Sequence, residues 1–143
     1  MRKIKIRGYV VDKMLENQWQ YGFGVLETKY TDGTREYTLF TSHGTYEVHP
    51  KSIGQYIGLK DKNGKEICEG DIIEYTLDIY NNEGEYVSQK KKRFVVRYNH
   101  EVAGYEPFSC RAYDSNLSKV IGNIFENPEL LEVIKSSEPS FKG

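Results

Sequence analysis

The sequence predicts a mainly β protein, a small bent barrel or half-barrel followed by a short C-terminal helix. Three observations support this class. Aromatic residues form 13% of the chain, with 12 tyrosines, and such side chains suit half-buried pleated surfaces. Short apolar or alternating runs are separated by glycine-containing turns, as in small β proteins. Finally, Asn-Pro-Glu at residues 127–129 precedes two leucines, which is typical of a helix start.

The first third of the chain predicts a strand at residues 3–6, because two isoleucines there alternate with two lysines. Aromatic and β-branched residues then flank Asp32-Gly33, a pair that tolerates the positive φ of a tight hairpin turn. His43-Gly44 marks a second reversal. These signals together predict antiparallel strands joined by short turns.

The most concentrated turn signals lie between residues 58 and 75, which read GLKDKNGKEICEGDIIEY. Asn63-Gly64 is the preferred pair for a tight type I′ turn, and Gly70-Asp71 predicts a second corner directly before an apolar strand. We interpret these four residues as structural. They allow the backbone to reverse twice at low steric cost.

The second half of the chain predicts a long polar hairpin or loop at residues 78–92. Strands are expected at residues 94–98, 108–113 and 120–125, and the helix is expected from Asn127 onward. No linker or repeat interrupts this pattern. We therefore expect one domain over residues 1–135.

The remaining residues, 136–143, are rich in Ser, Glu, Pro, Lys and Gly and predict a flexible tail. The net charge of −1 creates no global field that attracts polyanions. No apolar run approaches the roughly 18 residues of a membrane span, and charged residues interrupt the N-terminal apolar positions. The expected location is the cytoplasm, with no membrane partner.

The sequence predicts no metal, no cofactor and no enzymatic activity. The side chains that could ligate zinc do not have the spacing of a zinc site. Glycine-rich phosphate-binding motifs and the GxSxG motif of serine hydrolases are also missing. The five residues considered as ligands are His43, His49, His100, Cys68 and Cys110.

The two cysteines have bland interpretations. Strand alternation around Ile67 turns Cys68 outward beside Glu66 and Glu69, and carboxylates suppress the thiolate that a nucleophile needs. Cys110 is expected to behave as a small buried hydrophobic residue. A hydrolase that uses the carboxylates near Asp71 is the least favoured function, because no partner residue for them can be identified.

A basic run, Lys90, Lys91, Lys92 and Arg93, is the one sharp charge feature. Basic residues near aromatic ones can bind single-stranded nucleic acid through phosphate contacts and base stacking. The preferred interpretation is a charged hairpin end or an edge strand that lysines protect from aggregation. Acidic residues nearby would weaken the local positive field.

The chain resembles the YopX-like family of small proteins encoded by bacteriophages and prophages. The likeness rests on the opening residues 2–7, on residues 55–56, 58–67 and 69–73 in the middle, and on residues 120–131 at the end. The resemblance implies a β-rich fold with SH3-like barrel character and a phage origin. It implies no known activity and no catalytic residue.

Two positions depart from the family pattern. Cys68 stands where a bulky residue is expected, and Gly8-Tyr9 stands where the family often continues with Ala-Trp. These differences affect local packing only.

The leading functional hypothesis is a non-enzymatic accessory protein that acts through protein contacts, as a homo-oligomer or with a host or phage protein. The many aromatic residues on short strands motivate it, because exposed aromatic side chains often lie at interfaces. The alternative is a small barrel that binds single-stranded nucleic acid through Lys90 to Arg93.

Overall fold

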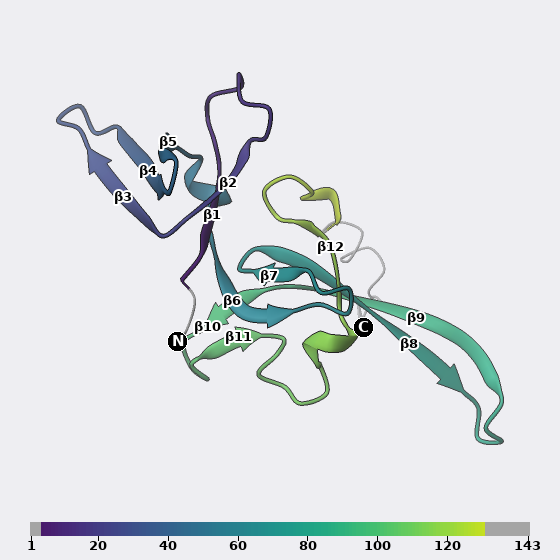
Figure 1. Ribbon diagram of the computed structural model, residues 1–143. Coiled ribbons are helices and arrows are strands. Elements are labelled where there is room, and N and C mark those ends of the chain that lie inside the picture. The colour runs from purple at the N-terminus through teal and green to yellow at the C-terminus, as the bar shows by residue number, and fades with distance from the viewer. Residues whose placement is uncertain (1–3, 131–143) are drawn as a thin grey trace. The chain divides into compact units, whose positions relative to one another are not determined.

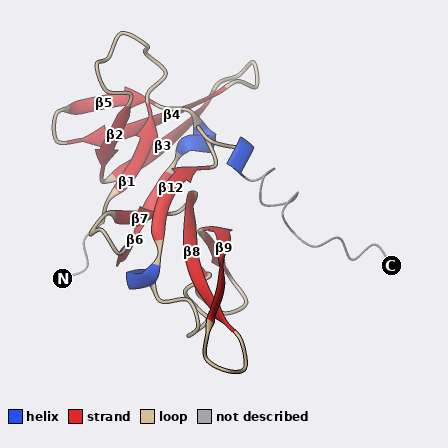
Figure 2. Cartoon of the chain, turned by 90° about the vertical axis from the view of Figure 1, so that its right-hand side faces the viewer, coloured by secondary structure: helices blue, strands red, loops and turns tan. Residues whose placement is uncertain are grey.

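The computed structural model describes residues 4–130 of the chain (Figure 1). Of these residues 54% lie in strands and 6% are helical, so the mainly β prediction is confirmed. The chain divides into two compact units, residues 1–58 and 59–143. Figure 2 shows that nearly all regular elements in the described part are strands joined by short loops.

Unit 1 contains two small antiparallel sheets. One has the order β2-β1-β6 and continues through the end of β6 to a fourth strand, β7 (Glu66–Cys68), of unit 2; the other has the order β3-β4-β5. A 3₁₀ turn, η1 (Pro50–Ser52), precedes β6. The strands are β1 (Ile6–Tyr9), β2 (Trp19–Gly22), β3 (Gly24–Lys29), β4 (Arg35–Thr41), β5 (Gly44–Glu47) and β6 (Gly54–Lys60).

The core of unit 1 is formed by Val10, Leu39 and Val48, each at most 2% exposed. Leu39 comes from β4, and an isolated bridge joins Val10 to Val48. The end of β2 approaches β4 so closely that a Cβ on Gly22 would lie 2.1 Å from the Phe40 carbonyl oxygen. Only glycine fits this contact.

Unit 2 begins with the end of β6 and continues into seven further elements. Its main sheet is antiparallel and has the order β12-β8-β9, and β10 pairs with β11 in a small ribbon. The elements are β7 (Glu66–Cys68), β8 (Asp71–Tyr80), β9 (Tyr86–Val95), β10 (Arg97–Asn99), β11 (Gly104–Glu106), the 3₁₀ turn η2 (Ser115–Leu117) and β12 (Lys119–Asn123).

The interior of unit 2 is built mainly from the first half of β8. Ile72 and Ile73 are fully buried, as are Ile67 of β7 and Val96 after β9. Tyr75 is 3% exposed, and burial raises its pKa to about 12. Beyond Tyr75 every remaining residue of β8 is exposed, so the β8–β9 hairpin has a packed base and a solvated outer half.

The expected barrel is not formed. Among residues 4–130 none of the sheets closes on itself, and the ladders end in separate two-, three- and four-stranded groups. A barrel requires hydrogen bonds between its first and last strands. Here the ten-residue strands β8 and β9 pair with each other along their length, while β12 covers only the first residues of β8.

Three local predictions have clear outcomes. The long hairpin over residues 78–92 is confirmed as the outer part of β8 and β9. The strand over residues 108–113 is wrong, because hydrogen-bonded turns occupy this segment, with Cys110 N–H donating to the Pro107 carbonyl oxygen. The strand predicted at residues 3–6 is displaced toward the C-terminus. The first strand in the described residues is Ile6–Tyr9, and Ile4, expected to face the core, is 63% exposed.

Only the start of the predicted C-terminal helix lies in the described part of the chain. Glu129 and Leu130 are helical, and the Leu130 N–H donates to the Asn127 carbonyl oxygen at 3.0 Å. The rest of that helix and the tail over residues 136–143 lie outside the described residues, so a C-terminal helix is not shown. No helix within residues 4–130 is long and apolar enough to cross a membrane.

Candidate interaction surface

The outer half of the β8–β9 hairpin is the most exposed regular structure in the described part of unit 2, residues 59–130. We call residues 76–91 the arm. Its two strands pair in register from Thr76 opposite Lys91 to Tyr80 opposite Tyr86, with one irregularity near the turn. All the arm's residues are exposed, and Figure 1 shows the hairpin tip extending beyond the other strands of unit 2. The arm is therefore a two-stranded ribbon.

Strand alternation gives the ribbon two different faces, since residues directly opposite each other point to the same side. The first, the Leu77 face, contains the pairs Leu77–Lys90 and Ile79–Ser88, and continues at its base into the pair Tyr75–Lys92. The second, the Glu74 face, contains the pairs Glu74–Arg93, Thr76–Lys91 and Asp78–Gln89.

The basic run is divided between these faces. Lys91 and Arg93 lie on the Glu74 face, where Arg93 Nε is 2.9 Å from one Glu74 oxygen and Lys91 Nζ is 3.7 Å from the other. The Glu74 carboxylate thus offsets part of their charge. Lys90 and Lys92 lie on the opposite face, so the four cations do not form one continuous patch.

Lys92 covers an aromatic cluster at the base of the Leu77 face. Its ammonium lies 5.4 Å from the ring centroids of both Phe94 and Tyr113 and donates a hydrogen bond to the Tyr113 hydroxyl at 2.8 Å. The two rings pack edge to face at 4.7 Å, and Tyr75 completes the cluster. Lys92 is therefore engaged within its own chain.

Large apolar side chains stand on the arm in solvent. Leu77 and Ile79 are 43% and 39% exposed although both lie on one face of one strand. Near the tip, Tyr80 and Tyr86 form an edge-to-face pair at 5.9 Å, and Val87 beside them is 58% exposed. A cluster of exposed apolar residues of this kind is typical of a protein contact surface.

The predicted turn residues Asn63 and Gly64 lie in the β6–β7 connection. Gly64 has a φ of +80°, but Asn63 does not have positive φ, so the turn is a three-residue loop with a glycine bulge and not type I′. A residue that sequence reasoning missed holds this loop. Asp61 Oδ1 accepts the backbone N–H groups of Asn63 and Lys65, each at 2.9 Å.

Asp61 also reaches the last strand of unit 2. Its second oxygen, Oδ2, accepts the backbone N–H of Val120 at 3.0 Å, and the residue is 5% exposed. Burial acts to raise the pKa of the Asp61 carboxyl, but the three N–H donors and the nearby Lys65 ammonium outweigh it and hold the pKa below its ordinary value. The aspartate directly before a Lys-Asn-Gly turn was the available signal.

Gly70 and Asp71 form the second corner. Gly70 has a φ of +92°, and its N–H donates to the Val96 carbonyl oxygen. Asp71 accepts the Cys68 N–H at 2.8 Å, and only 1% of it is exposed, so the expected bond to nearby backbone is present while the expected solvation is not. This corner brings together β7, β8 and the end of β9.

The cysteine expectations are both wrong. Cys68 is 4% exposed, because the three-residue strand β7 turns inward at the Asp71 corner. Cys110 is exposed, because the segment that should have buried it as a strand is a series of turns.

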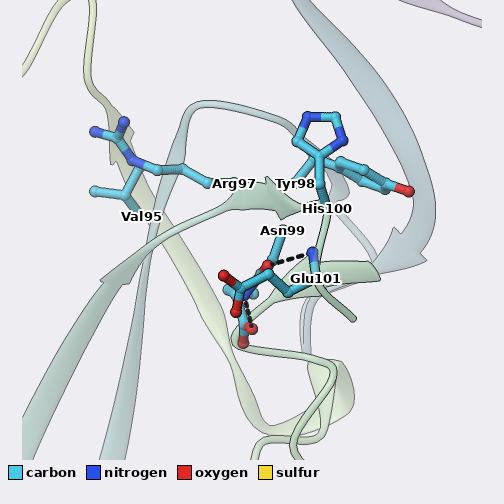
Figure 3. A pocket seen from close by; sticks show the side chains of 7 residues that line it. Val95, Arg97, Tyr98, Asn99, His100 and Glu101 are labelled. Carbon is cyan, nitrogen blue, oxygen red and sulfur yellow. Dashed lines mark hydrogen bonds between the residues drawn. The ribbon is translucent and has the colours of Figure 1, made fainter. Parts of the chain in front are cut away.

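An open hollow of about 480 Å³ lies beside β10 and β11 (Figure 3). Glu106 Oε1 accepts a hydrogen bond from Asn99 and its Oε2 accepts one from Ser109, so this carboxylate fixes the local loop. Figure 3 shows the side chains of Arg97 and His100 well separated and pointing in different directions. The polar groups of the hollow therefore do not converge on one point.

The other sequence candidates are dispersed. His43 lies in an exposed turn and His49 packs against the Tyr9 ring. In the part of the chain that the structure describes, no three His, Cys, Asp or Glu side chains are grouped so as to hold a metal ion.

These features define a β-rich protein whose most prominent surface is a solvated two-stranded arm. The sequence model of the family described as "YopX protein" matches residues 9–132, and the chain belongs to this family. The suspected resemblance is thereby confirmed. No curated protein matches the sequence at a significant level.

One solved structure similar to this chain is that of protein EF1440 from Enterococcus faecalis. It shares 22% sequence identity, and the alignment covers 92% of this chain and 99% of that one, with a TM-score of 0.46.

Proposed function

We propose that this YopX family protein is a non-enzymatic protein-interaction module that acts as a homo-oligomer. The observation that carries the proposal is the exposure of Leu77 and Ile79 on one face of the arm, beside exposed tyrosines at its tip. Side chains of this size lose favourable burial when they stand in water, and a partner surface would recover it.

The proposal includes finer points from the sequence. They are a phage or prophage origin, a role as an accessory protein in the bacterial cytoplasm, and SH3-like character of the fold. A host or phage protein could bind the same arm, in which case the homo-oligomer would compete with it.

The arrangement of the basic run supports this proposal over nucleic-acid binding. Two of the four cations lie beside Glu74, and a third covers the ring of Tyr113. A groove that binds single strands needs cations and aromatic faces directed to one side. The exposed apolar face instead resembles the centre of a protein interface.

Light scattering after size exclusion tests the oligomer. The wild-type chain is expected to show a mass above that of one chain, rising with concentration, and the double change Leu77→Ser/Ile79→Ser is expected to shift it to a monomer. The matched control, Thr76→Ser/Asp78→Asn, alters the opposite face of the same strand and should leave the mass unchanged. A wild-type monomer at every concentration would contradict the proposal.

A mobility-shift titration with a single-stranded oligonucleotide at low salt tests the alternative. We expect no shift that depends on Lys90 to Arg93. A salt-dependent shift that disappears when these four residues become Gln would favour nucleic-acid binding.

A further inference from the structure

The outer face of the β3-β4-β5 sheet in unit 1 combines an exposed apolar side chain with acidic residues, whereas the Leu77 face of the arm has lysines and no acid. Leu39 on β4 points into the core, so its strand neighbours Thr38 and Phe40 point outward. The register places Leu26, Thr38 and Glu47 in one row across the three strands. Leu26 is 54% exposed, which leaves an apolar side chain uncovered on this face.

Acidic groups frame this outer face. Glu36 lies two residues before Thr38 on β4, and Glu47 lies directly opposite Thr38 on β5. The Tyr30 hydroxyl donates a hydrogen bond to Glu36 at 2.5 Å. The Glu36 carboxylate raises the pKa of Tyr30, and Glu47 acts in the same direction, so both carboxylates influence one region. Among the strand residues of this face there are two acids and no Lys or Arg.

The Leu77 face of the arm has the complementary pattern. Its cross-strand pairs contain Lys90 and Lys92 and no acid. Two Leu77 faces packed on each other would oppose lysine to lysine, which is unfavourable. An apolar face with acidic borders matches the Leu77 face better than a second arm does.

We propose that the Leu77 face of one copy packs on the outer face of the β3-β4-β5 sheet of a second copy, and that the exchange is reciprocal. Leu77 and Ile79 cover Leu26 and the half-buried Phe40, and Lys90 approaches Glu47 of the second copy. This assignment rests on the proposed homo-oligomer and names its interface.

Size considerations favour reciprocity. Paired strands lie about 5 Å apart and successive rows on one face about 7 Å apart, so three rows of a ribbon cover only a few hundred Å². A stable interface needs about 800 Å² from each partner. Two equivalent contacts, one from each arm, approach that size and close the assembly as a two-fold dimer.

A charge-swap experiment on the whole chain tests the interface. Lys90→Glu and Glu47→Lys are each expected to weaken the dimer about tenfold at every contact. Each change occurs in both contacts of the dimer, so the dissociation constant should rise about a hundredfold. The combined variant Lys90→Glu/Glu47→Lys restores opposite charges and should recover most of the affinity. Sedimentation velocity over a concentration series measures all four proteins.

Glu27→Lys is the matched control. Glu27 lies on the same sheet as Glu47 but on its other face, where it pairs with Arg35 at 3.0 Å. This change should leave the dissociation constant within about twofold of wild type. Circular dichroism of each variant checks that the fold is retained.

The outcomes separate the interface from the proposed function. A wild-type dimer that neither charge reversal weakens, or that the combined variant fails to restore, overturns this interface and leaves the homo-oligomer standing. A wild-type monomer at every concentration overturns both.

Discussion

Two hairpin turns of unit 2, at residues 61–65 and 81–85, have the same local structure in different surroundings. Each begins with an Asp or Asn whose side-chain oxygen accepts the backbone N–H groups two and four positions later, all at 2.9 Å. Each has glycine at its fourth position, with φ of +80° at Gly64 and +81° at Gly84. The local chemistry of the two turns is therefore matched.

The turn at residues 61–65 differs from the other in that it also binds a distant strand of unit 2. Asp61 is 5% exposed and also accepts the N–H of Val120, whereas Asn81 is exposed at the tip of the arm. A carboxylate suits the first position, because both of its oxygens accept. An asparagine there would turn its NH₂ group toward the Val120 donor. The same local loop structure thus anchors β12 at residues 61–65 and forms a solvent-exposed tip at residues 81–85.

The largest expected difference is between Asp61→Ala and Asn81→Ala. Asp61→Ala leaves the partly buried Val120 N–H without its acceptor and removes two further bonds to a charged group, which should destabilise the protein by about 3 kcal/mol. Asn81→Ala removes two bonds in solvent and should cost about 0.5–1 kcal/mol. Urea unfolding measures both variants. Equal midpoints would show that the two turns contribute equally to the free energy of unfolding, which would contradict this prediction.

Acid should affect the two turns differently. The pKa of Asp61 in the folded chain lies below its ordinary value of 3.8, so its contribution to stability is complete above that pH and is lost as the pH falls through the folded pKa. As the pH falls below about 4, the wild type should therefore lose stability more steeply than Asp61→Asn. Urea midpoints at several acidic pH values test this, and parallel curves would assign the acid sensitivity to other carboxylates.

The smallest difference is expected at the glycines. A Cβ on Gly64 or Gly84 would meet no atom within 4 Å, so alanine adds only the strain of a left-handed backbone. Each substitution should cost about 1–2 kcal/mol, and the two values should agree within about 0.5 kcal/mol. Thermal unfolding of Gly64→Ala and Gly84→Ala checks this. A clearly larger loss at Gly64 would mean that its turn must move to accept the methyl group.

Local sequence patterns predict most of the turns and many of the paired strands. Glycine beside Asp or Asn marks the turns at Gly33, Gly64 and Gly84, and apolar alternation before and after them places the paired strands. Period two also implies that consecutive lysines on a strand separate onto opposite faces. For the run from Lys90 to Arg93 the rule places two cations on each face of the strand.

Long-range contacts could not be predicted. The bond between Asp61 and Val120 joins residues 59 positions apart, and no local pattern identifies that partner. Closure of a sheet also depends on which distant strands meet, so short strands with turns could not decide for or against a barrel. Burial of Cys68 likewise depends on the Asp71 corner, where a side chain and a backbone donor compete with simple alternation.

The distance in sequence between Asp61 and its donor, the Val120 N–H, has a consequence for synthesis. A growing polypeptide exposes the 61–65 loop long before β12 is made, so the Oδ2 atom has only water as a donor until Val120 leaves the ribosome. Because this contact joins residues 59 positions apart, it can form only after residue 120 has been translated. Truncated products that stop before residue 120 should therefore be the ones that cellular proteases remove.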